Sequence, residues 1–76
     1  MNKIRRKNLQ SIIDQLEDLK SSLEELQEEE EDYRDNMPEN LQGSERYDRA
    51  DEAVSNIEDA VSSIEEAISS IESAVE

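Results

Sequence analysis

Apolar residues recur along this chain in two helical periods, which are separated by a short polar stretch. In the first period the steps alternate between three and four residues, the spacing of a heptad seam on an α-helix. This series consists of Leu9, Ile12, Leu16, Leu19, Leu23, Leu26 and Tyr33. Ile13 broadens the stripe at one end, and Glu30 takes the seam position before Tyr33, where looser packing is expected. The pattern predicts a first helix over residues 2–35.

The second period is stricter, because an Ala followed by a β-branched residue recurs every seven positions. These pairs are Ala53-Val54, Ala60-Val61, Ala67-Ile68 and Ala74-Val75, and Ile57, Ile64 and Ile71 stand between them. The result is a broad apolar stripe with an edge of alanines. β-Branched residues lower helix propensity slightly, so this helix depends on packing for its stability. It is predicted to span residues 44–75.

The stretch between the two periods, about residues 36–43, predicts a tight connection. It contains the only Pro and the only Gly of the chain, Pro38 and Gly43. A residue that precedes Pro is biased away from helix, and Ser44, directly after Gly43, is a good N-cap for the second helix. A connection this short returns the chain antiparallel. We therefore expect an all-α fold, a single antiparallel two-helix hairpin with heptad seams.

A single hairpin of this kind would leave much of both apolar stripes in water. Seventy-six residues form at most one small domain, and such chains are marginal unless something reinforces them. The chain has neither Cys nor His, which excludes disulfides and ordinary zinc sites. Oligomerisation or unusually regular helix packing remains, and we expect self-association into a helical bundle, as a dimer or a larger oligomer. The oligomer number and the docking geometry of the hairpins stay open.

Charge is distributed unevenly in this chain, whose formal net charge is −14. The first eight residues carry four cations and no acid, whereas residues 9–32 and 50–76 are strongly acidic. The chain as a whole repels polyanions, so we expect no direct binding to nucleic acid or to a membrane surface. The basic start is followed by no apolar segment, as a signal peptide would require, and no apolar run is long enough to span a bilayer. A cytoplasmic protein is expected.

The turn region departs from the rest of the chain and is the candidate binding site. Residues 33–49 are nearly neutral and hold both aromatic residues and three of the eight basic residues. Tyr rings can stack on a nucleobase, and Arg side chains pair with phosphate oxygens. Alternatively, the Tyr residues only cap the bundle end and the Arg residues neutralise nearby acids. The candidate ligand-binding residues are Tyr33, Arg34, Asn40, Gln42, Ser44, Arg46, Tyr47 and Arg49.

Three other charged or polar features each have a functional and a structural interpretation. The five consecutive acids at 28–32 could mimic DNA toward a basic protein, or could keep a solvated helix face soluble. The Ser pairs at 62–63 and 69–70 could receive phosphate or line a second interface, or could simply fill exposed heptad positions. The basic segment from Lys3 to Lys7 could contact a membrane or RNA, but it is a weak patch on a chain of net charge −14. It is instead expected to pack against acidic residues of a neighbouring chain, although cations at a helix N-terminus oppose the helix dipole.

The sequence contains little that could support catalysis. A nucleophile needs a neighbouring base, usually His, and the chain has no His. Gly-rich phosphate-binding motifs and metal-ligand spacings are also absent from it. We therefore expect a non-enzymatic protein that uses no metal and no cofactor.

The segment PENLQGSERY, from Pro38 to Tyr47, together with the Ala-Val and Ala-Ile heptads after it, resembles small acidic proteins encoded by phages and mobile elements of Firmicutes. The resemblance covers most of the chain. It brings no activity with it and therefore assigns no site residues. By its context it implies an inhibitor of a host system, either a sponge for a nucleotide signal or a mimic of DNA.

The leading hypothesis is a self-associating binding protein of phage counter-defence that sequesters a small phosphate-bearing nucleotide signal at the turn. The first alternative is an acidic DNA mimic that inhibits a basic host nucleic-acid-binding protein. The second alternative is a purely structural oligomeric scaffold with no ligand.

Overall fold

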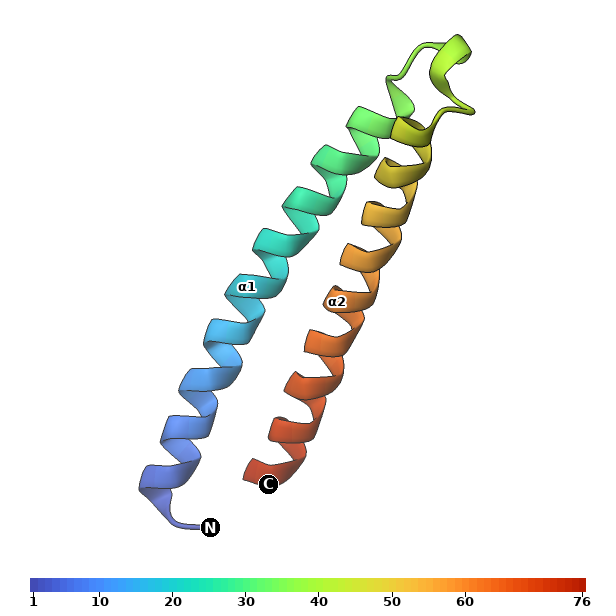
Figure 1. Ribbon diagram of the computed structural model, residues 1–76. Helices are drawn as coiled ribbons and strands as arrows, with labels where there is room; N and C mark the ends of the chain where they lie inside the picture. Colours follow the sequence, from blue (N-terminus) through green and yellow to red (C-terminus); the bar gives the residue numbers. More distant parts are fainter.

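The computed structural model describes residues 1–76 and consists of two long helices joined by a short turn (Figure 1). Helix α1 spans Lys3–Asp35, a 3-10 turn η1 spans Glu39–Leu41, and helix α2 spans Glu45–Val75. The helices run antiparallel and pack along their length, which gives a rod of 60 × 15 × 12 Å. The predicted all-α antiparallel hairpin is confirmed. Each helix begins one residue later than predicted and ends at the predicted residue.

Both helices begin at a side-chain cap. The Asn2 side-chain oxygen accepts a hydrogen bond from the Arg5 backbone N–H at 2.7 Å, and the Ser44 hydroxyl accepts one from the Tyr47 backbone N–H at 3.3 Å. Each bond satisfies an N–H group that has no carbonyl partner in the first turn of its helix. The Ser44 hydroxyl also donates to the Leu41 carbonyl oxygen, which ties the start of α2 to the turn. The predicted N-cap at Ser44 is confirmed.

The contact between the helices lies to one side of the stripe that the heptad spacing predicts on α1. Ile13 is the only buried residue of that helix, and the positions seven and fourteen residues later are Lys20 and Gln27, both half-buried. Helix α2 contributes to the contact mainly through the β-branched residue of each of its first three apolar pairs. The buried residues of α2 are Ala50, Val54, Val61 and Ile68. The rotation of α1 toward Ile13 leaves part of its apolar stripe without a partner.

Four large apolar side chains of α1 are therefore exposed at intervals of seven residues. They are Ile12, Leu19, Leu26 and Tyr33, whose exposed fractions are 44%, 58%, 53% and 49%. Leu16 and Leu23, which lie between them, are half-buried, and so are Ile57, Ile64 and Ile71 of α2. The exposure follows one heptad position from Ile12 to Tyr33, so it is not fraying at an end of the helix. The expectation that a lone hairpin leaves its stripes partly in water is confirmed.

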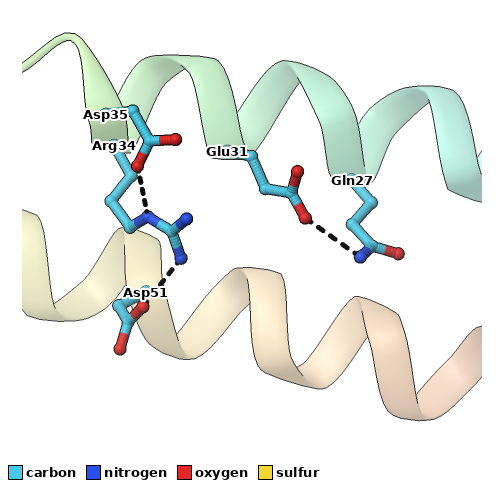
Figure 2. A network of polar contacts seen from close by, with 5 residues as sticks. All are labelled: Gln27, Glu31, Arg34, Asp35 and Asp51. Atoms are coloured by element: carbon cyan, nitrogen blue, oxygen red, sulfur yellow. Dashed lines mark hydrogen bonds and ion pairs between the residues drawn. The ribbon is translucent and has the colours of Figure 1, made fainter.

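Ion pairs close one long edge of the hairpin, which we name the polar edge. The Lys20 Nζ lies 4.0 Å from a Glu65 carboxylate oxygen, and the Arg34 Nη1 lies 2.8 Å from an Asp51 carboxylate oxygen. Figure 2 shows the second pair, in which the Arg34 side chain reaches from α1 to α2. Ion pairs as exposed as these add little to the free energy of unfolding. Both pairs, however, are consistent with one register between the two helices.

The alignment leaves the start of α1 without a neighbour. The two ion pairs of the polar edge are separated by fourteen residues on each helix, so the register is constant between them. Continued eleven residues beyond the Lys20–Glu65 pair, this register sets Leu9 opposite Glu76, the last residue of the chain. The preceding residues, 1–8, therefore extend past the end of α2 (Figure 1). We name this segment the basic overhang.

We predict that Ser44→Ala lowers the free energy of unfolding by about 0.5–2 kcal/mol, because the start of α2 loses its cap. Urea unfolding followed by circular dichroism at a fixed protein concentration measures the change. Gly43→Ala is the matched control. Gly43 does not have a positive φ, and a Cβ there meets no atom within 4 Å, so this neighbouring substitution leaves stability unchanged or raises it. Equal unfolding midpoints for S44A and the unmodified chain would contradict the capping role.

Candidate ligand site at the turn

All eight predicted binding residues lie at the turn end of the hairpin, but their side chains do not form one cluster. Two come from the last turn of α1, two from the connection, and four from the start of α2 with its N-cap. In chain order they are Tyr33 and Arg34, then Asn40 and Gln42, then Ser44, Arg46, Tyr47 and Arg49. The structure divides them among an open hollow, the polar edge, the helix contact and the exposed connection.

Three of the eight line one open hollow between the two helices. The hollow has a volume of about 430 Å³ and is lined by Glu30, Tyr33, Glu45, Arg46, Arg49 and Ala50. The Tyr33 side chain is 49% exposed, so much of its ring is open to a ligand. The hollow thus combines an aromatic surface with two guanidinium groups, which is the chemistry that binds a base and a phosphate.

The charges around the hollow are balanced in a single chain. Arg49 donates a hydrogen bond to the Glu45 carboxylate one helical turn earlier, so its charge is already matched. Arg46 takes part in no ion pair, and neither does Glu30 on the opposite wall. Arg46 is therefore the cation that an anionic ligand could use, and Glu30 would repel the same ligand.

Arg34 lies on the polar edge, away from the hollow. Neighbouring residues on a helix point about 100° apart, so Tyr33 and Arg34 face different sides. The Arg34 Nε donates to Asp35 at 3.0 Å and its Nη1 donates to Asp51 at 2.8 Å (Figure 2). The hydrogen bond to Asp35 raises the pKa of the Arg34 guanidinium above its ordinary value; desolvation opposes the rise and Asp51 adds to it. This geometry favours the structural interpretation of Arg34, as a link between the helices.

The other four predicted residues share no site. The Ser44 hydroxyl is occupied as the N-cap of α2. Tyr47 precedes Val54 by seven residues, so it continues the buried series of α2, and its side chain is half-buried. Asn40 and Gln42 are exposed in and after η1. None of these four side chains lines the hollow.

Two carboxylates that border the hollow, Glu30 and Glu45, are not among the predicted ligand-binding residues. The turn is distinctive in the sequence for its Tyr and Arg residues, whereas acids occur throughout the chain. Glu30 stands three residues before Tyr33, and Glu45 stands four residues before Arg49. Residues at these separations share a helix face, so the spacing alone would have placed both acids beside the predicted binding residues.

A second hollow on α1 is wholly polar. It has a volume of about 400 Å³ and is lined by Ser21, Glu24, Glu25, Gln27, Glu28 and Glu31. No three carboxylates of the chain come together in a way that could hold a metal ion. Neither helix has the length of apolar sequence that a membrane crossing needs. The acidic surface around this second hollow is the part of the chain on which the DNA-mimic hypothesis depends.

Comparisons with known protein families, with curated proteins and with solved structures found no match for this chain. The resemblance to small phage proteins gains no support from them. The function proposed for the chain therefore rests on its own residues and their geometry.

We predict that Arg34→Gln lowers the urea midpoint of unfolding slightly, because the ion pair with Asp51 that joins the two helices is lost. Arg46→Gln removes the same charge from the same end of the rod and is the matched control. Since Arg46 pairs with no carboxylate, its replacement leaves the midpoint unchanged. Unfolding curves at one protein concentration measure both variants. Equal midpoints for the two variants would show that Arg34 does not link the helices.

Proposed function

We propose that the protein is a self-associating, non-enzymatic binding protein whose turn end takes a small phosphate-bearing ligand. The observation that carries the proposal is the row of large apolar side chains, from Ile12 to Tyr33, that α1 exposes at heptad spacing. Single exposed apolar residues are ordinary on protein surfaces, but a contiguous row marks a protein–protein contact. A second copy of the hairpin offers a row with the same spacing.

The exposed row and the alanine edge of α2 border the same side of the hairpin, which we name the open face. Tyr33, the last residue of the row, lines one hollow with Arg46, and Arg46 stands one heptad before Ala53, the first of the alanines. The ion pairs of the polar edge lie at other heptad positions. The open face therefore runs along both helices from the turn toward the termini.

Acids avoid the open face over most of its length. Away from the turn, the positions that flank the exposed row on its outer side are neutral, and so are the alanine edge of α2 and the positions outside it. These flanking residues are Asn8, Gln15 and Ser22 on α1, and Asn56, Ser63 and Ser70 on α2. Near the turn, the same flanking positions hold Glu29 and Arg49. A face that stays solvated in a chain of net charge −14 would be expected to carry acids. Its neutrality supports self-association through this face, because interface cores are depleted of charge.

The ligand part of the proposal rests on the hollow beside the turn. Tyr33 would stack on a planar group, and Arg46 would pair with phosphate oxygens. Both side chains are available in the structure, since Tyr33 is half-exposed and Arg46 has no carboxylate partner. The context implied by the resemblance to phage proteins would make this ligand a host nucleotide signal and the protein a counter-defence factor.

An acidic mimic of DNA is the second candidate function, and the distribution of acids favours it. The carboxylates that avoid the open face gather elsewhere, around the second hollow of α1 and along α2. Such a surface would attract a basic host protein, and the attraction would weaken steeply with added salt. A purely structural scaffold would share the self-association and would bind neither kind of partner.

We predict that the purified protein sediments as a dimer or a larger oligomer, and that Leu19→Gln with Leu26→Gln weakens the association at least about a hundredfold. Both leucines are more than half exposed in the single chain, so the substitutions remove apolar contact only from an assembly. Leu41→Gln is the control, because Leu41 is exposed outside the row. Sedimentation equilibrium measures all three. A folded monomer at all concentrations for the unmodified protein would overturn self-association.

We predict that a cyclic or linear nucleotide binds at the turn, and that Arg46→Gln and Tyr33→Leu each weaken its binding about tenfold or more. Leu at position 33 keeps the apolar row intact, so the second variant tests stacking alone. Calorimetry with a panel of nucleotides, and mass spectrometry of extracts from the purified protein, supply the measurements. Gln42→Ala, at the turn but outside the hollow, is the control. Flat titrations with salt-sensitive capture of a nucleic-acid-binding protein would favour the DNA mimic instead.

A further inference from the structure

Two charged residues interrupt the apolar rows of α1 at opposite ends. The first row, Leu9, Leu16 and Leu23, is followed one heptad later by Glu30. The exposed row that begins at Ile12 is preceded one heptad earlier by Arg5. Glu30 is half-buried and Arg5 is exposed, and neither has an ion pair within the chain. A charge within an apolar seam is costly unless an opposite charge meets it there.

Antiparallel docking of two α1 helices brings these two interruptions into contact. In an antiparallel coiled coil, a residue of one row packs beside a residue of the other row on the partner helix. One alignment makes three such layers apolar on both sides and a fourth oppositely charged, and it sets Tyr33, at the end of the exposed row, beside the partner's Asn2. Its layers are Leu9 with the partner's Leu26, Leu16 with the partner's Leu19, Leu23 with the partner's Ile12, and Glu30 with the partner's Arg5.

The two neighbouring alignments are unfavourable. A shift of one heptad in one direction sets Glu30 against the partner's Ile12. The opposite shift sets Arg5 against the partner's Leu23. Each shift leaves a charged group packed against apolar side chains without an opposite charge. The free-energy cost of burying that charge exceeds any gain from additional apolar contact. The two interruptions therefore select one register among those that the heptad spacing allows.

The basic overhang suits the same arrangement. Its cations form no ion pair in their own chain, where no part of α2 lies alongside them. In the antiparallel pair, the overhang of each copy lies beside the acidic run 28–32 of the other. The alternative stacking, with both turns at one end, would instead gather the two overhangs together and the two acidic runs together. Electrostatics therefore favours the antiparallel arrangement.

From these observations we infer that a second copy of this chain docks on the open face, with its α1 antiparallel to the first, and that each copy inserts Arg5 into the turn hollow of the other. The inference rests on the proposed self-association. The partner's Arg5 pairs with Glu30, so the carboxylate that opposes an anion in the single chain is neutralised. Arg46 is then unopposed, and the hollow becomes a cationic site built from two copies, one at each end of the dimer.

Charge exchange between positions 5 and 30 tests this arrangement. Arg5→Glu alone and Glu30→Arg alone each set like charges together in both symmetric layers and raise the dimer dissociation constant about tenfold or more. The double variant R5E/E30R restores it to within about threefold. The two residues are about 38 Å apart along α1, so a restoration can only arise between copies. Glu at position 5 also suits the helix dipole, so loss of the dimer cannot be attributed to unfolding of α1.

Arg6→Glu is the matched control, since it changes the charge equally at the neighbouring position, and E30R does not rescue it. A second measurement uses the absence of native Cys. Leu9→Cys with Leu26→Cys gives a disulfide-linked dimer under mild oxidation, whereas Leu9→Cys alone does not, because the two copies of position 9 are far apart. Failure of both the charge rescue and the crosslink in a protein that still sediments as a dimer would overturn the arrangement and leave self-association standing. If the double variant restores the dimer and the crosslink forms, but no nucleotide binds, only the ligand proposal would be contradicted.

Discussion

The apolar stripes of this hairpin are wider than one neighbouring helix can cover, and the rest of the structure depends on that mismatch. Only six of the 76 residues are buried, which is too small a core for a chain that has no Cys for disulfides to rely on. Helix α1 turns Ile13 toward α2 and leaves the row from Ile12 to Tyr33 outside. Because acids also avoid most of that side, the exposed row is better understood as half of a contact between two proteins than as an ordinary solvated surface.

The periodicity of the sequence predicts the two helices and their antiparallel return closely, because heptad spacing, Pro38 and the Ser44 cap all act locally. The rotation of α1 about its axis is not local. The spacing identifies an apolar stripe on α1 that is about two heptad positions wide. Which part of this stripe contacts α2 depends on how the two helices pack against each other, and the spacing does not show it. The half-buried Lys20 and Gln27 occupy inner positions that a purely apolar pattern does not mark. The short η1 between the helices was not predicted, because a segment of three residues is too short to show a hydrophobic period.

The turn was predictable as a distinct region but not as a single site. Its composition, rich in Tyr, Arg and amides, singles out residues 33–49, and a hollow lies there. Composition does not indicate, however, which way each side chain faces on its helix. Tyr33 faces the hollow while Arg34, one residue later, crosses to Asp51 on the polar edge. Ser44 and Tyr47 serve the fold of α2, as the N-cap and as a continuation of its inner stripe, so only part of the predicted set faces one ligand.

Glu30 has a different meaning in each state of the protein. In the single chain it is a flaw in an apolar row and an unfavourable neighbour for any anion that approaches Arg46. In the proposed dimer the same carboxylate fixes the register, as a lone polar residue does in other coiled coils, because only one alignment supplies it with a cation. Assembly and anion binding are then linked. A phosphate-bearing ligand that prefers the neutralised hollow must stabilise the dimer by as much free energy as the dimer contributes to holding the ligand. A small acidic protein could in this way remain weakly associated until its ligand is present, with the heptads supplying the contact and one pair of charges deciding where it forms.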